Sequence, residues 1–238
     1  MPVASSANQT AKASPSKTVR APAAQRGATR LQVDQAVRNA LLTGRFVPGK
    51  AVTLRGLAQE LGVSPMPVRE VIQGLAAERA LDVKPNGRVQ VPEMTADRFS
   101  EILKARLLLE TELSCMAMEN LDNTDAKELT SIDLDIDESI ISGNAEAYMR
   151  LNHLFHFRIY RASNSSILLP LVESLWLQFA PYMRTVYGRV GTVNLIDQHK
   201  EAIHAISNKN ADALRNAITA DIQDGMGMIG REGLPPEA

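Results

Sequence analysis

The sequence predicts a mainly α-helical protein, built from an N-terminal winged helix-turn-helix and a C-terminal all-α antiparallel helical bundle. Three observations favour this fold class. Two short helical patterns are separated by a glycine at position 62. Strand-like alternation of apolar and polar residues occurs only before residue 95. From Thr95 onward the apolar residues recur at helical spacing.

The segment from Thr53 to Ile72 carries the first prediction. Its apolar residues follow the three- and four-residue spacing of an amphipathic helix, at Leu54, Leu57, Ala58 and Leu61. Gly62 is suited to end that helix, Ser64 to cap a second one, and Pro65 to occupy the first position of the second helix. Two short helices joined by a glycine-containing turn indicate a helix-turn-helix, whose second helix enters the DNA major groove.

Two arginines would project from these helices, Arg55 from the first and Arg69 from the second. A planar guanidinium can grip a guanine edge or a phosphate at two points. The alternative is a plain packing unit with solvated arginines. After the helices, Asn86-Gly87 separates two strand-like segments, which predicts a hairpin wing with an Asn-Gly turn. The residues expected at the DNA interface are Arg55, Ser64, Pro67, Arg69, Asn86, Gly87 and Arg88.

This N-terminal pattern resembles that of the GntR family of transcriptional regulators over residues 31–92. The resemblance is carried by Leu42-x-Gly44-x-x-x-Pro48-Gly49, by Leu57-Ala58-x-x-Leu61-Gly62-Val63-Ser64-x-x-Pro67-Val68-Arg69-Glu70, and by Leu75 and Gly87. Many relatives carry a DNA-contacting arginine directly after the serine, where this chain has Pro65. The resemblance therefore implies that Arg55, Arg69 and the wing carry more of the DNA contact here.

Charge is distributed unevenly along the 238 residues. Residues 1–95 hold 13 Lys and Arg against 6 Asp and Glu, whereas residues 96–238 hold 13 against 21. A basic front half suits a nucleic-acid-binding module joined to a domain that does not touch DNA. We expect residues 1–28 to be a disordered basic tail, 29–94 the DNA-binding domain, 95–230 the helical domain, and 231–238 a second disordered tail.

The single cysteine, Cys115, has no partner for a disulfide, which favours a reducing cytoplasm. No apolar run approaches the length that spans a membrane, so no membrane association is expected.

The C-terminal half divides into six helical segments with short connections. They are Thr95–Met118, Thr124–Ile141, Ala145–Ala162, Ile167–Tyr187, Leu195–Ser207 and Ala211–Met228. Such bundles build ligand and metal sites from side chains that face each other in the core.

Four polar residues are candidates for such a site. Asn152 and His156 lie four apart on one helical face, and His199 and Asp221 lie symmetrically about a turn near Asn210. Two imidazoles, a carboxylate and an amide oxygen would form a nitrogen and oxygen site for zinc, nickel or a similar divalent ion. Alternatively, these residues are hydrogen-bonded core groups. By helical geometry His153 and His204 point away from the ligand-like face, so neither is expected to bind the metal.

The helical half is similar to the FCD effector domain of the FadR-type branch of the same family. The matching residues are Arg106-x-x-x-Glu110, Phe155-His156, Asn164, His199 and Ala202-Ile203-x-x-Ala205-Ile206. The resemblance implies a divalent metal held by one Asp and three His, which helps to hold a small carboxylate effector. By position the ligands fall on Asn152, His156, His199 and Asp221, so the carboxylate ligand has changed helix.

The resemblance also implies that Arg106 and Asn164 bind the effector. For Arg106 the equally weighted alternative is a structural ion pair with Glu110, four residues along the helix.

The leading functional hypothesis is a ligand-responsive bacterial transcriptional regulator, not an enzyme. It would bind a palindromic double-stranded operator as a homodimer and sense a small carboxylate. A second hypothesis is a metal-dependent hydrolase with an accessory DNA-binding domain, for which Glu201 is the nearest candidate base although it points away from the His199 face. A third is a constitutive DNA-binding protein whose pocket stays empty. Metal analysis with a screen of small acids for thermal stabilisation separates these hypotheses.

Overall fold

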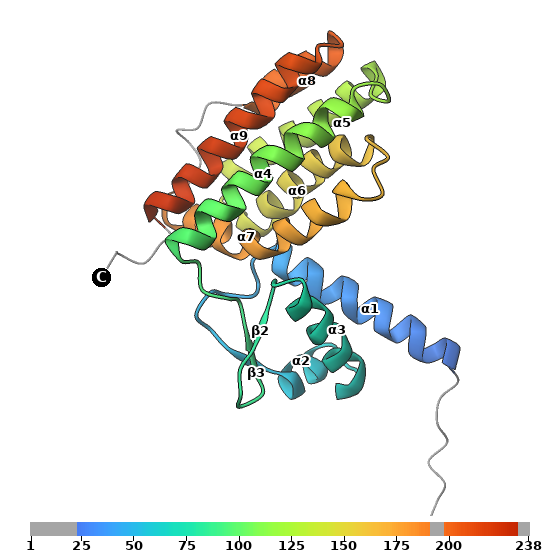
Figure 1. Ribbon diagram of the computed structural model, residues 1–238, viewed down its shortest axis with the longest axis vertical. Coiled ribbons are helices and arrows are strands. Elements are labelled where there is room, and N and C mark those ends of the chain that lie inside the picture. Colours follow the sequence, from blue (N-terminus) through green and yellow to red (C-terminus); the bar gives the residue numbers. More distant parts are fainter. Residues whose placement is uncertain (1–22, 191–197, 233–238) are drawn as a thin grey trace, which may run out of the picture.

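The computed structural model describes residues 23–190 and 198–232 and confirms the predicted fold class. Figure 1 shows two bodies: helices α1–α3 and the small sheet below, and the bundle of α4–α9 above. The expected tail over residues 1–22, the expected helix start at Leu195 and residues 233–238 lie outside the described residues. Within the described part, no helix is both long enough and apolar enough to cross a membrane.

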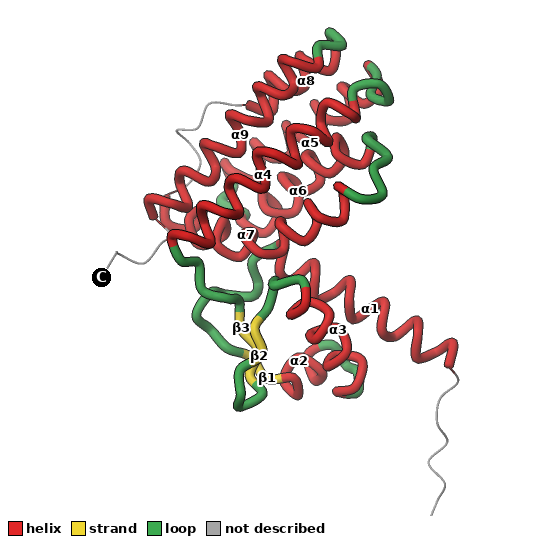
Figure 2. The backbone as a smooth tube through the Cα atoms, in the orientation of Figure 1, coloured by secondary structure: helices red, strands yellow, loops and turns green. Residues whose placement is uncertain are grey.

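The N-terminal body follows the order helix, strand, two helices and two strands. The elements are α1 (Ala23–Leu42), β1 (Val52–Thr53), α2 (Leu54–Glu60), α3 (Pro65–Ala77), β2 (Asp82–Val83) and β3 (Arg88–Gln90). The three short strands form an antiparallel sheet in the order β1-β3-β2, in which Val89 pairs with both Val52 and Val83. In Figure 2 this sheet lies beside α2 and α3, which completes a winged helix-turn-helix.

The first helix begins earlier than expected. Helix α1 starts at Ala23, inside the 1–28 segment that the sequence analysis assigned to a disordered tail. The buried residues Val33, Val37 and Leu41 anchor the later turns of this helix. Alanine has the highest helix propensity, so the alanine-containing start AAQRGA can extend a helix that is anchored further on.

Local capping explains the helix-turn-helix. The Thr53 side chain accepts a hydrogen bond from the Gly56 backbone N–H at 3.0 Å and starts α2. Gly62 has a φ of +65°, a conformation that glycine adopts without steric cost, and it turns the chain between α2 and α3. Ser64 is the N-cap residue of α3 but makes no side-chain capping bond, and Pro65 follows at the first helical position.

The wing turn differs from the expected two-residue Asn-Gly turn. The Gly87 backbone N–H donates to the Lys84 carbonyl at 2.8 Å, so Pro85 and Asn86 are the central residues of the turn. Only Gly87 has a positive φ, of +75°, whereas a two-residue type I′ turn needs two such residues. The loop is therefore a β-turn followed by a left-handed glycine. Pro85 favours this solution because its φ is restricted to negative values.

The C-terminal body consists of α4 (Ala96–Ala117), α5 (Asn123–Ile141), α6 (Ala145–Arg161), α7 (Leu168–Val190), α8 (Gln198–Ser207) and α9 (Ala211–Glu232). Side-chain caps start several of these helices: Thr95 for α4, Asp122 with Asp125 for α5 and Asn144 for α6. Helices α8 and α9 form a hairpin around Lys209, which has a φ of +53°. Aromatic residues dominate the core, with Phe155, Tyr160 and Trp176 at most 1% exposed.

Helix α7 connects the two bodies. From this helix, Ser174 donates to the Glu78 carbonyl at 3.3 Å and Tyr182 donates to the Pro92 carbonyl at 2.6 Å. The Nη1 of Arg184, also on α7, donates to the Thr43 carbonyl at 3.3 Å. These bonds hold the winged helix against the bundle.

Candidate metal centre and nucleic-acid interface

The side chains expected to contact DNA lie mostly on the surface of the N-terminal body. Arg55 on α2 and Arg69 on α3 are exposed, as are Ser64 and the wing residues Asn86, Gly87 and Arg88, whereas Pro67 is partly buried. Within the described part of the chain, neither Arg55 nor Arg69 forms an ion pair. Asn86 has a turn-stabilising role, since its Oδ1 accepts a hydrogen bond from the Arg88 backbone at 3.1 Å. In Figure 1, α2 and the β2–β3 hairpin lie at the end remote from the bundle.

Two histidines and an aspartate converge in the bundle core. His156 Nε2 lies 3.2 Å from Asp221 Oδ2, and His199 Nε2 lies 3.7 Å from Asp221 Oδ1. One ligand atom from each residue lies within 4.8 Å of the other two. The closeness of His199 and Asp221 agrees with their symmetry about the α8–α9 turn. His153 and His204 are not in this group.

These distances fit a divalent metal. Zinc binds nitrogen and oxygen at about 2.0–2.2 Å, which places tetrahedral ligand atoms roughly 3.3–3.6 Å apart. The separations of His156 Nε2 and His199 Nε2 from the nearer Asp221 oxygen, 3.2 and 3.7 Å, are close to that range. Burial tends to raise the pKa of Asp221, but His156, His199 and Arg106 outweigh it and lower the pKa to about 2. Asp221 is therefore ionised at neutral pH, as a metal ligand must be.

The outer nitrogen of each imidazole is held by a buried partner: the Asp133 carboxylate for His199, and the Tyr160 hydroxyl for His156. His199 Nδ1 lies 3.0 Å from Asp133 Oδ1, and a carboxylate only accepts hydrogen bonds. His156 Nδ1 lies 3.1 Å from the Tyr160 hydroxyl, which donates its one proton to Glu110 Oε2 at 2.8 Å. Each Nδ1 therefore carries a proton, and in a neutral ring the Nε2 that faces Asp221 keeps its lone pair. Such carboxylate–histidine arrangements orient metal ligands in many proteins.

Sequence reasoning missed Asp133 and Tyr160. Asp133 comes from α5 and lies 66 positions before His199, so no local spacing links them. Tyr160 lies four residues after His156 on α6, at the same spacing that pointed to Asn152. That spacing was the available signal for Tyr160. Asn152 itself is buried, with 6% exposure, and lines the same cavity as His156 and Asp221.

Arg106 forms the ion pair that the sequence analysis weighed against an effector role. Its Nε and Nη2 donate to the two carboxylate oxygens of Glu110, at 2.6 and 3.2 Å. Burial opposes the charge, but pairing with Glu110 raises the pKa of Arg106 overall. The guanidinium also lies over the ring of Phe179, with Cζ 3.9 Å from the ring centroid. Arg106 nevertheless lines the cavity, and its Nη1 has no hydrogen bond to any described residue.

Asn164 is the one expected effector residue that lies elsewhere. It is exposed, does not line the cavity and follows the end of α6 with a φ of +54°. It lies eight residues beyond His156, or about 12 Å along a helix. Asparagine is one of the few residues that tolerate a left-handed conformation. In this structure Asn164 lies in the turn after α6, away from the cavity.

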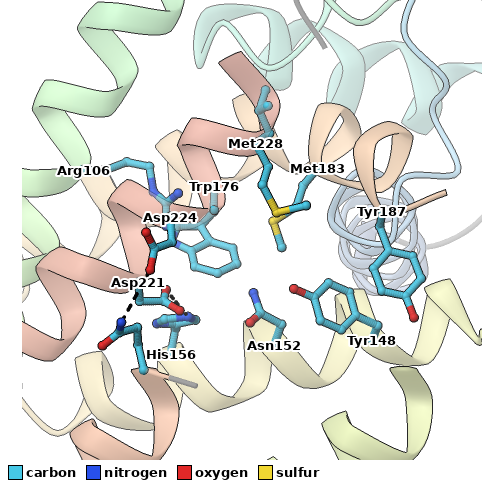
Figure 3. Close-up of a pocket in the computed structure, with 13 residues that line it drawn as sticks. Arg106, Tyr148, Asn152, His156, Trp176, Met183, Tyr187, Asp221, Asp224 and Met228 are labelled. Atoms are coloured by element: carbon cyan, nitrogen blue, oxygen red, sulfur yellow. Dashed lines mark hydrogen bonds and ion pairs between the residues drawn. The ribbon is translucent and has the colours of Figure 1, made fainter. Parts of the chain in front are cut away.

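The cavity beside the three converging residues has a volume of about 70 Å³. Figure 3 shows Arg106, His156 and Asp221 at one end, Asn152 and Trp176 between, and Met183, Met228 and Tyr148 toward the other. Trp176 is 1% exposed, and its indole Nε1 has no acceptor among the described residues. A buried unpaired donor costs about 1–3 kcal/mol, which a bound acceptor would recover.

Comparisons with known proteins agree with this architecture. Residues 29–91 match the family model for bacterial regulatory proteins of the gntR family, and residues 101–224 match the FCD domain. The HTH-type transcriptional regulator McbR of Escherichia coli is 29% identical over 202 residues, covering 84% of this chain and 91% of McbR. The gluconate operon transcriptional repressor of Bacillus subtilis is 26% identical over 213 residues, covering 84% of each chain.

Solved structures show the same fold. The structure of Escherichia coli McbR/YncC aligns with a TM-score of 0.80 at 27% identity, covering 86% of this chain and 98% of that one. A putative GntR transcriptional regulator from Rhodococcus aligns with a TM-score of 0.69 at 20% identity, covering 86% and 99%. A winged helix-turn-helix followed by a helical domain with a polar core site defines a transcriptional regulator. The chain belongs to the GntR family, in the branch that carries an FCD domain.

Proposed function

We propose that this regulator binds a palindromic DNA operator as a cytoplasmic homodimer, and that a small carboxylate effector in the bundle cavity alters its affinity for the operator. The observation that carries the proposal is the convergence of His156, His199 and Asp221 next to Arg106, inside a domain joined to a DNA-binding module. Nothing in this role needs catalysis. Glu201, the candidate base for a hydrolase, is exposed and does not line the cavity.

In this proposal Asn152, His156, His199 and Asp221 hold one divalent metal, with zinc the best match to the nitrogen and oxygen ligands. When bound, the metal supplies positive charge to which an effector carboxylate can bind. Asp133 and Tyr160 keep the two imidazoles in the orientation and protonation state that ligation requires. Arg106, held by Glu110, offers its remaining nitrogen to the same carboxylate.

Helix α7 is the proposed route from the cavity to the DNA-binding domain. Its residues Trp176 and Met183 line the cavity, and the neighbouring residues Ser174, Tyr182 and Arg184 bond to the N-terminal body. An effector that prefers one position of α7 would therefore shift the population of domain arrangements. The size of the change in operator affinity depends on how much more tightly the effector binds one domain arrangement than the other.

The metal is tested by elemental analysis of the purified chain and of His156→Ala and His199→Ala. His204→Ala, which removes an exposed histidine outside the cluster, is the matched control. We expect close to one equivalent of metal in the wild type and His204→Ala, and little in the other two variants. All four proteins should still bind the operator. Metal-free wild-type protein after preparation without chelators, even when zinc is added back, would contradict the proposal.

The dimer is tested separately. Sedimentation of the full chain at micromolar concentration should give twice the mass of 26.0 kDa. Because two-fold protein symmetry implies two half-sites, an operator selected from random DNA should be a pseudo-palindrome, and deleting one half-site should weaken binding strongly. A monomer both free and on DNA would rule out the homodimer.

A further inference from the structure

The polarity of the side chains that line the cavity changes from one end to the other, and the same change occurs along three helices. On α6 the lining residues run from His156 through Asn152 to Tyr148, at intervals of four. On α9 they run from Asp221 to Met228, and on α7 from Trp176 to Met183. Figure 3 shows the two ends: charged and imidazole groups at one, thioethers and a tyrosine ring at the other. A ligand that fills the cavity must therefore be polar at one end and apolar at the other.

The polar end offers hydrogen-bond donors. Arg106 Nη1 and Trp176 Nε1 both belong to buried residues that line the cavity, and neither has an acceptor among the residues that the structure describes. Two donors beside the proposed metal site match the two oxygens of one carboxylate. An ammonium head group has no acceptor and would leave both of these donors unsatisfied.

The lining carries too little positive charge for a second acid group. Arg106 is the only Lys or Arg among the described residues that line the cavity, and Glu110 already neutralises it. Asp221 and Asp224 also line the cavity. A dicarboxylate would place its second charge near these aspartates or among the methionines. Either position is unfavourable.

The apolar end selects against hydroxyl groups. Met183 and Met228 present thioether side chains there, and the neighbouring Ile229 is 1% exposed. Thioethers are weak hydrogen-bond acceptors and do not donate, so a polyhydroxylated tail would find little beyond the Tyr148 hydroxyl there to replace the water that it loses. The volume of about 70 Å³ limits the tail. At 10–15 Å³ for each water-sized group, it holds roughly five to seven heavy atoms.

We infer that the effector is a short monocarboxylate with an apolar tail of about three to five carbons in total, and that the cavity discriminates against sugar acids and dicarboxylates. This inference rests on the proposed function, because it places the carboxylate at the proposed metal site. It adds the class of acid that the regulator senses.

Three four-carbon acids test the inference: butyrate, threonate with its three hydroxyl groups, and succinate with its second carboxylate. Titration calorimetry on zinc-loaded full-length protein should give a Kd for butyrate at least about tenfold lower than for the other two. An equal or tighter Kd for threonate or succinate would overturn the inference. So would the absence of binding by all three acids to protein that retains metal and binds its operator. If the protein holds no metal, the proposed function itself fails.

A matched pair of variants assigns the selectivity to the apolar end. Met228→Gln places an amide of similar length in the cavity, and Met116→Gln makes the same change at a position that is 39% exposed on α4. Met228→Gln should weaken butyrate binding about tenfold, with metal content unchanged. The preference for butyrate over threonate, measured as the ratio of their Kd values, should decrease or reverse. Met116→Gln should behave as wild type. Met183→Gln provides a second test if Met228→Gln fails to fold, and unchanged butyrate binding in a folded, metal-loaded variant would overturn the inference.

Discussion

The carboxylate of Asp133 lies 3.0 Å from Nδ1 of His199, although the two residues are 66 positions apart. Asp133 is 3% exposed, so this contact is buried between α5 and α8. It determines which nitrogen of His199 faces Asp221. The candidate metal site therefore depends on a helix that supplies none of its proposed ligands.

Asp133→Asn should weaken metal binding about 10–100-fold, because an amide holds the imidazole less firmly and lowers its basicity. Zinc affinity measured by competition with a chromophoric chelator tests this. Asp135→Asn, an exposed change two residues along α5, is the control and should leave the affinity unchanged. Equal affinities for the two variants would show that Asp133 does not support the site.

Arg69→Ala and Arg55→Ala should each reduce operator affinity. A lost bidentate guanine contact costs about 1–3 kcal/mol and relaxes specificity at one base pair. A lost phosphate contact weakens all sequences alike and reduces the salt dependence of binding. Arg150→Ala, which removes an exposed arginine from α6, controls for net charge. Fluorescence anisotropy at several salt concentrations separates the cases, and unchanged affinity in both variants would exclude these helices as the DNA-binding surface.

His153 should make the protein less stable in mild acid. Burial, with smaller contributions from Arg161 and His156, lowers the pKa of His153 to about 3, against 6.5 in the unfolded chain. Below pH 6.5 the unfolded chain binds a proton that the folded chain does not. The free energy of unfolding therefore decreases as the pH is lowered. This group contributes at most about 1.4 kcal/mol per pH unit.

His153→Phe keeps an aromatic ring in the stack on Phe157, where the centroids are 4.2 Å apart, and removes the titrating group. Urea unfolding with chelator present tests this. Between pH 7.5 and pH 5.5 the free energy of unfolding should decrease by about 1 kcal/mol more in the wild type than in the variant. Equal losses would mean that His153 titrates normally in the folded protein.

Gly44 should be needed for the contact between the two domains. Its φ is +68°, and a Cβ at this position would lie 2.4 Å from Cβ of Arg184 on α7. Gly49 has a similar φ of +78°, but a Cβ there would meet nothing within 4 Å, so Gly49→Ala measures the backbone strain alone. That strain is about 1–2 kcal/mol. Gly44→Ala should lower the free energy of unfolding, measured by thermal unfolding, by about 1–3 kcal/mol more than Gly49→Ala does. Equal losses in the two variants would show that α7 shifts to accommodate the added Cβ at little cost.

Local patterns in the sequence determined the fold class. Apolar spacing defined the bundle helices, and residues such as Gly62 and Thr95 marked their ends, because capping and left-handed turns depend on a few neighbouring residues. The same local regularity brought two site residues within reach. His199 and Asp221 could be paired because helix rise and a tight turn determine which residues face each other in a hairpin.

Only the tertiary structure decided the surroundings of that pair. The position of Asp133 depends on how α5 packs against α8, and the pairing of Arg106 with Glu110 occupies two of its three guanidinium nitrogens. Asn164, which the family resemblance assigned to the effector, lies outside the cavity in the left-handed turn that follows α6. Helical spacing shows which residues share a face. Which group a buried side chain finally contacts depends on desolvation and on the hydrogen-bond partners that other helices bring to it, and these exist only in the packed core.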